Sequence, residues 1–213
     1  MGLFERKRSV RALGPVAIES IRKELESVLS VASSYDQLMS HNETVPISLE
    51  GRIRGDLLAF VLYLSGVSRG VDPREIEVVN QIFDIDLCHV DFQIFRTDVS
   101  DHLFEYAIPA SILCLQELGS ILQQEMASSG KAVDTDLASA FIVDLINMYA
   151  LVGSALISAD GKVTERESAD LVRYLHRMCV GAFGPEAKMP EGPASRTLTA
   201  HVRLFGKEPK LDT

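Results

Sequence analysis

Apolar residues recur every three or four positions through most of the chain between Pro15 and Met178, the spacing that places them on one face of an α-helix. The first such segment runs from Pro15 to about residue 33, and a second extends from about Ser48 to Leu64. A third begins after Asp72, and a short fourth covers roughly Asp86 to Phe95. Because no useful length of this region alternates between apolar and polar residues, the pattern predicts helices and no strands.

The second half of the chain continues in the same way. Ser100 begins a long apolar segment that reaches Ser128, and we expect it to be kinked or split at Pro109 because proline lacks a backbone N–H. A very apolar helix should start at Asp134 or Thr135 and run through Leu156, and a final helix from Thr164 to about Cys179. The fold class that follows is all-α, a compact bundle of about seven helices.

Three regions follow from this pattern. Residues 1–14 form a basic N-terminal segment that we expect to be mobile, residues 15–180 form the helical bundle, and residues 181–213 form a C-terminal tail rich in proline and glycine. The tail could dock through Val202, Leu204 and Phe205, and a β-hairpin within 195–206 is an alternative.

The composition points to an aliphatic core and an acidic surface. Hydrophobic residues make up 46% of the chain, aromatic residues 7%, and tryptophan is absent. The formal net charge of −9 argues against a nucleic-acid partner, which would need a basic face to displace counterions from phosphates. One basic cluster is an exception and could contact acidic lipid headgroups or an acidic partner, although a solvated terminus is the simpler interpretation: Arg6, Lys7, Arg8 and Arg11.

The cysteines and the longest apolar run bear on localisation. Cys88, Cys114 and Cys179 are widely spaced and fit neither a disulfide framework nor a zinc motif, so we expect a reducing compartment. The longest uncharged run, Leu145 to Ala159, has 15 residues, which is short for a membrane span and suits a buried helix. These features favour the cytoplasm.

An internal repeat links two helix starts at an offset of 92 residues. The run Val71–Glu75 aligns with Val163–Glu167, and each follows a long apolar helix and opens an amphipathic one. Each has a capping residue, Asp72 or Thr164, followed three positions later by glutamate, the pattern of a capping box. We expect two helix–turn–helix units that pack face to face, since neither can bury its apolar stripe alone.

The second of these turns, Ile-Ser-Ala-Asp-Gly-Lys-Val-Thr-Glu-Arg-Glu at residues 157–167, resembles the signature turn of the TerB-like family. That family includes tellurite-resistance TerB and the N-terminal domain of the co-chaperone DjlA. The resemblance implies a compact bundle of about seven helices with an internal duplication over residues 15–180. The first repeat departs from the family pattern, because Val67-Ser68-Arg69 stands where Ala-Asp-Gly is expected.

The same turn contains the only candidate metal ligands. With Gly161 at the sixth position of an EF-hand loop, Ser158, Asp160 and Glu167 fall at the third, fifth and twelfth. The first ligand position is then Leu156, which has no oxygen to offer, so a full EF-hand is excluded. Asp160 and Glu167 remain candidates for a weakly bound divalent cation, which the resemblance favours because TerB-like domains have been associated with an acidic surface. The alternative is structural, with Gly161 supplying a positive φ and Glu167 a helix cap.

Catalytic motifs are absent from the sequence. The five histidines are scattered, and the chain has no glycine-rich phosphate loop, nucleophile elbow or His-Glu-x-x-His motif. We therefore expect a non-enzymatic interaction module of a bacterial stress-response or envelope-associated system, with an unidentified protein partner. The alternative is a module that responds weakly to divalent cations through the Asp160 turn.

Overall fold

A computed structural model describes residues 6–39, 48–67, 72–98, 108–128 and 136–211. Helices account for about three-quarters of the described residues, which confirms the prediction of a compact all-α bundle. The described elements are, in order, β1 (Lys7–Ser9), α1 (Pro15–Met39), α2 (Leu49–Val67), α3 (Pro73–Phe83), α4 (His89–Asp98), α6 (Ala110–Ser128), α7 (Asp136–Ile157), β2 (Lys162–Thr164), α8 (Glu165–Phe183) and α9 (Pro193–Phe205).

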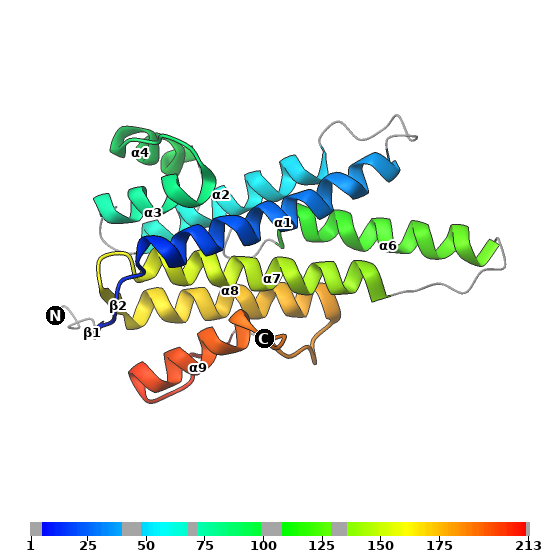
Figure 1. Cartoon of the computed structure of the whole chain (residues 1–213). Coiled ribbons are helices and arrows are strands. Elements are labelled where there is room, and N and C mark those ends of the chain that lie inside the picture. Colours follow the sequence, from blue (N-terminus) through cyan, green and yellow to red (C-terminus); the bar gives the residue numbers. More distant parts are fainter. Residues whose placement is uncertain (1–5, 40–47, 68–71, 99–107, 129–135, 212–213) are drawn as a thin grey trace.

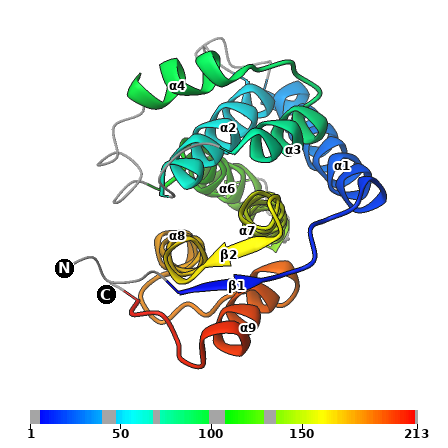
Figure 2. The same cartoon turned by 90° about the vertical axis from the view of Figure 1, so that its left-hand side faces the viewer.

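The apolar helix α7 lies at the centre of the bundle (Figures 1 and 2). It contacts α1, α2, α3, α6, α8 and α9, and its residues Leu145, Ile146 and Tyr149 are fully buried. Its stretch Leu137–Ile157 is long and apolar enough to cross a membrane, but 67% of the most apolar window is buried inside the bundle. Here, α7 is the core around which the other helices pack.

The centre of the core is aromatic. The Phe60 ring of α2 lies 5.1 Å from that of Tyr149 on α7 and 4.8 Å from that of Tyr174 on α8, measured between centroids. Such offset contacts add to the free energy gained by burying the rings. Gly153 lets α8 approach α7 here, because a Cβ at this position would lie only 2.5 Å from Cδ1 of Leu171.

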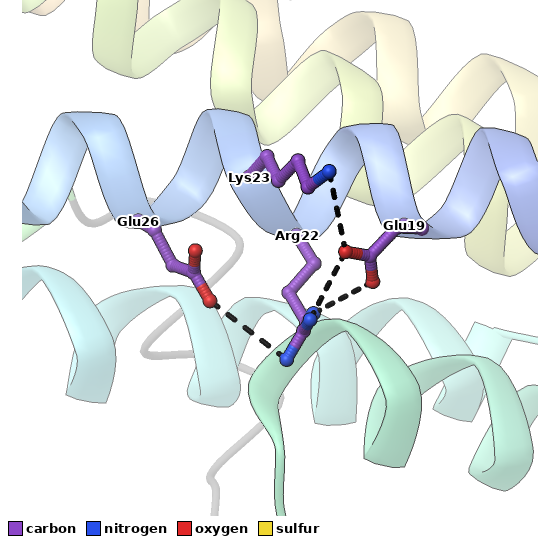
Figure 3. A network of polar contacts seen from close by, with 4 residues as sticks. All are labelled: Glu19, Arg22, Lys23 and Glu26. Carbon is purple, nitrogen blue, oxygen red and sulfur yellow. Dashed lines mark hydrogen bonds and ion pairs between the residues drawn. The ribbon is translucent and has the colours of Figure 1, made fainter.

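Four charged residues of α1 form an ion-pair network, shown in Figure 3. Arg22 Nε donates to Glu19 Oε2 at 2.9 Å, and Arg22 Nη1 lies 3.8 Å from Glu26 Oε1. Lys23 Nζ lies 3.7 Å from Glu19 Oε1. The hydrogen bond from Arg22 lowers the pKa of the Glu19 carboxyl. Glu19 and Arg22 are half-buried, whereas Lys23 and Glu26 are exposed, and such surface pairs contribute little stability.

The C-terminal region differs from the expected tail. Pro193–Phe205 forms α9, which packs on α7 and α8, so the bundle extends well beyond residue 180. Within the described residues α9 is the eighth helix, where about seven were expected, and the hairpin considered for 195–206 is not formed. Asn147 of α7 anchors the start of α9, because its Oδ1 accepts the N–H of Ala194 at 3.0 Å and its Nδ2 donates to the carbonyl of Glu191.

The face by which α9 docks was only partly predicted. Phe205 is buried as expected, whereas Val202 and Leu204 are only partly buried. Most of the inward face is instead formed by small or polar residues: Ala194, Thr197 and His201. His201 is 1% exposed, its Nδ1 lies 2.9 Å from Ser168 Oγ, and burial lowers the pKa of its imidazole.

The segment boundary at proline was correctly predicted. Ala110 begins α6 directly after Pro109, whose carbonyl accepts the N–H of Ile112 at 3.0 Å. Residues 99–107, the remainder of the long segment expected from Ser100, lie outside the described residues.

The close approach at Gly153 can be tested with two glycine substitutions. Gly153→Ala should lower the free energy of unfolding by about 1–3 kcal/mol, because the new methyl group overpacks the contact with Leu171. The control is Gly55→Ala on α2, where an added Cβ meets nothing within 4 Å and should raise that free energy by about 0.5–1 kcal/mol through helix propensity. Urea unfolding followed by circular dichroism measures both, and equal effects would contradict the packing described.

Candidate functional site

The basic N-terminal residues and the Asp160 turn lie together at one end of the bundle. This end contains the first turns of α3 and α8, the turn between α7 and β2, and the β1–β2 pair, which faces the viewer in Figure 2. The Asp160 turn, the buried Glu167 and the basic N-terminal cluster therefore lie at the same end of the bundle.

The capping box at the start of α8 is formed as predicted. The Glu167 N–H donates to Thr164 Oγ1 at 3.1 Å, and the Thr164 N–H donates to Glu167 Oε2 at 2.9 Å. Both residues are buried, and so is Val163, which precedes them. The bonds satisfy backbone donors that a buried helix start would otherwise leave unpaired.

The first repeat has the same cap at the start of α3. The Arg74 N–H donates to Asp72 Oδ1 at 2.8 Å, and the Asp72 N–H donates to Glu75 Oε2 at 3.1 Å. Pro73 occupies the first turn, where its missing N–H has no cost. Both capping boxes of the repeat are thus confirmed, while Val71, the expected partner of Val163, lies outside the described residues.

The two caps lie close to one another. The Arg74 guanidinium donates through Nη1 to the main-chain carbonyl of Asp160 at 3.2 Å. Burial, with smaller contributions from the charges of Glu167, Asp72 and Asp160, raises the pKa of the Glu75 carboxyl from its ordinary 4.5 to about 7. The turn between α7 and α8 therefore packs against the start of α3, as expected for two helix–turn–helix units in contact.

The raised pKa of Glu75 makes stability depend on pH. Its carboxyl binds a proton more tightly in the folded chain than in the unfolded one, so wild-type stability should fall as pH rises from 4.5 through about 7. Glu75→Gln keeps an oxygen acceptor for the Asp72 N–H and carries no charge. The variant should match wild type near pH 5 and exceed its stability at pH 8 by about 1–3 kcal/mol.

Urea titrations at the two pH values measure this difference. The matched control is Glu77→Gln, an exposed glutamate on the same helix, which should change stability equally at both pH values. If wild type had the higher free energy of unfolding at pH 8, ionised Glu75 would stabilise the fold, contrary to the effect expected from its burial.

The two predicted metal ligands are both engaged in local backbone bonds. Asp160 Oδ1 accepts the N–H of Lys162 at 2.7 Å, and Gly161 follows with a φ of 76°. Glu167 uses one oxygen in its capping box. Within the described ranges, no three His, Cys, Asp or Glu side chains gather closely enough to hold a metal ion. Metal binding by Asp160 and Glu167 stays a prediction, with one carboxylate oxygen of each outside these bonds.

The basic N-terminal segment is attached to this turn. Residues 7–9 form β1, which pairs antiparallel with β2, with Lys7 opposite Thr164, Arg8 opposite Val163 and Ser9 opposite Lys162. The pairing continues beyond the strand, because the Glu165 N–H donates to the Arg6 carbonyl at 2.9 Å and the Val10 N–H to the Gly161 carbonyl at 3.0 Å. Within the segment expected to be mobile, residues 7–9 are thus a strand held by backbone hydrogen bonds.

The strand is exposed and positively charged. Arg6, Lys7, Arg8 and Arg11 are all exposed. Among the residues that the structure describes, no carboxylate forms an ion pair with any of the four. Arg6 lies near Glu165, whose carboxylate pairs with Lys207 Nζ at 2.7 Å.

Two further residues of this surface were not identified from the sequence. Lys162 is exposed and adds a fifth cation beside β1, and Arg74 joins the two turns. Neither carries a recognisable sequence signal, because each acts through a neighbour that is distant in the chain.

A shallow groove elsewhere has little polar chemistry. It lies between α1 and α7, has a volume of about 360 Å³ and is mostly apolar. Glu24 is its one titratable lining residue, and the others are Leu13, Ala17, Ser20, Ile21, Leu151 and Ser154.

The fold and this surface define a class: an all-α bundle with a duplicated, capped helix–turn–helix and a basic strand on its second turn. Comparisons of the chain with protein-family models, curated proteins and solved structures found no significant match. The resemblance to the TerB-like family therefore depends on residues 157–167 and on the duplication.

Proposed function

We propose that this chain is a non-enzymatic, TerB-like interaction module that acts through protein contacts in a bacterial stress-response or envelope-associated system in the cytoplasm. The turn at residues 157–167 and the two matching capping boxes support the family. The contact between the caps at Arg74 and Asp160 is what an internal duplication of this kind predicts.

The observation that carries the interaction role is the ordered basic strand. Four exposed cations are held in a defined place on a chain whose net charge is −9. A surface of opposite sign to the rest of the molecule attracts an acidic partner and orients it on approach. An acidic protein surface is therefore the partner that best fits this region.

Affinity capture with the full chain, tagged at its C-terminus, tests the role. The double variant Lys7→Glu, Arg8→Glu should recover its specific protein partner at least about tenfold less than wild type, because the contact charge is reversed. The matched control is Lys188→Glu, Arg196→Glu, which should recover the partner normally. Lys188 precedes α9 and Arg196 lies in its first turn, and both are exposed.

An exposed apolar surface on α4 is the alternative site for the protein contact. Val90 and Ile94 are 58% and 53% exposed, one turn apart on the face of α4 opposite the buried Phe92. Loss of the partner in Val90→Ser, Ile94→Ser, with retention in the Lys7 and Arg8 variant, would place the interaction on α4 and contradict the basic strand as the contact.

A divalent-cation response is the second candidate function. It is favoured by the concentration of negative charge around Glu75, whose raised pKa reflects in part the carboxylates of Glu167, Asp72 and Asp160. A bound cation would reduce this repulsion. Because few oxygens are available, a dissociation constant on the order of 0.1–1 mM is expected.

Thermal melting measures such binding. A cation at ten times its dissociation constant should stabilise the fold by about 1.4 kcal/mol, and Asp160→Asn should remove the shift. The comparison uses several millimolar calcium, magnesium or manganese against sodium chloride of equal ionic strength. An equal shift in melting temperature in wild type and variant, or none in either, would mean that the Asp160 turn connects the helices and binds no cation.

A further inference from the structure

On its outer edge, β1 has backbone groups that form no hydrogen bond within the described part of the chain. In an antiparallel pair, alternate residues direct both their N–H and C=O toward the neighbouring strand. The bonds at Arg6 and Val10 show that residues 6, 8 and 10 face β2. Lys7 and Ser9 consequently direct their N–H and C=O groups away from β2. The sheet has two strands, and no other described residue forms a hydrogen bond with these groups, so they form its unpaired edge.

The side chains along this edge favour a partner strand that carries negative charge. Residues directly opposite in a sheet share a face, so Lys7 and Ser9 lie on the same face as Thr164 and Lys162, and Arg8 lies on the other. Basic residues on an edge repel another basic strand. A second copy of β1 is therefore disfavoured, whereas an acidic strand gains both the backbone bonds and the charge attraction.

We propose that the outer edge of β1 binds an acidic, extended segment of a partner protein as a third, antiparallel strand. The proposal rests on the interaction role above and names the class of partner. Main-chain bonds to Lys7 and Ser9 provide the affinity, as in other cases of strand addition. Acidic side chains at alternate positions of the partner lie opposite Lys7 and Ser9 and beside Lys162, which sets the register.

A lipid surface fits this edge less well. Anionic headgroups would be attracted to the same cations, but a bilayer offers no directional array of N–H and C=O groups to match those of Lys7 and Ser9. The two partners therefore differ in whether binding depends on the main chain of β1.

A capped seven-residue peptide of alternating glutamate and valine is the probe, with binding to the full chain followed by fluorescence anisotropy. In the proposed pairing the amides of the glutamates face β1 and those of the valines face away. N-methylation at the glutamates should weaken binding at least about tenfold, whereas N-methylation at the valines should be tolerated. The equivalent lysine–valine peptide should not bind.

Two protein variants separate the contribution of backbone hydrogen bonds to peptide binding from that of charge. Ser9→Pro removes an N–H that faces away from β2, a position where an edge strand tolerates proline, and should weaken peptide binding about tenfold. Ser9→Ala is its control and should bind as wild type does. Lys7→Glu should weaken binding by a similar factor at low salt, and by less at high salt.

The outcomes distinguish this inference from the broader interaction role. Equal effects of the two N-methylated peptides, or binding to vesicles of phosphatidylcholine with phosphatidylserine but not to the peptide, would overturn strand addition. A captured protein that depends on Lys7 and Arg8 but is retained by Ser9→Pro would keep the interaction role and overturn only the strand. Absence of any specific captured protein, together with failure of the peptide, would overturn both.

Discussion

The reciprocal hydrogen bonds between Thr164 and Glu167 determine where α8 begins, and the rest of this end of the bundle is built around that point. Both side chains are buried, so the cap cannot be replaced by water without opening the core. With the cap in place, β2 is held in extended conformation beside it. β1 then pairs with β2, and the start of α3 contacts the preceding turn. A buried capping box therefore connects helix geometry to the exposed strand.

At the same end of the bundle, one group both stabilises the fold and destabilises it. Glu75 serves as the cap of α3, yet its burial near Glu167 disfavours its ionised form. Natural proteins tolerate such conflicts where a site has a function beyond folding. Here, the exposed cations of β1 lie beside the strand that leads into the cap of α8, on a chain whose net charge is −9.

The C-terminal helix illustrates how a bundle can be completed by a weakly apolar segment. Ala194, Thr197 and His201 bury little apolar area compared with the leucines of α7. Polar contacts supplement the packing, through Asn147 at the start of α9, Ser168 at His201, and the ion pair of Lys207 with Glu165 at its end. The prolines and glycines of residues 181–213 predicted a tail, and an inward face with so few large apolar residues gives no helical hydropathy pattern to indicate otherwise.

The sequence alone determined the helices as far as α8 and the caps of α3 and α8. Helical periodicity and the Asp72–Glu75 and Thr164–Glu167 pairs are local features, since each involves residues three or four positions apart. Only the tertiary structure decided the pairing of Lys7–Ser9 with Lys162–Thr164, the contact of Arg74 with Asp160 and the docking of α9. These contacts join residues dozens of positions apart, and a three-residue strand has no periodicity long enough to be read. Their formation depends on which surfaces the packed helices bring together, which no local pattern in the chain encodes.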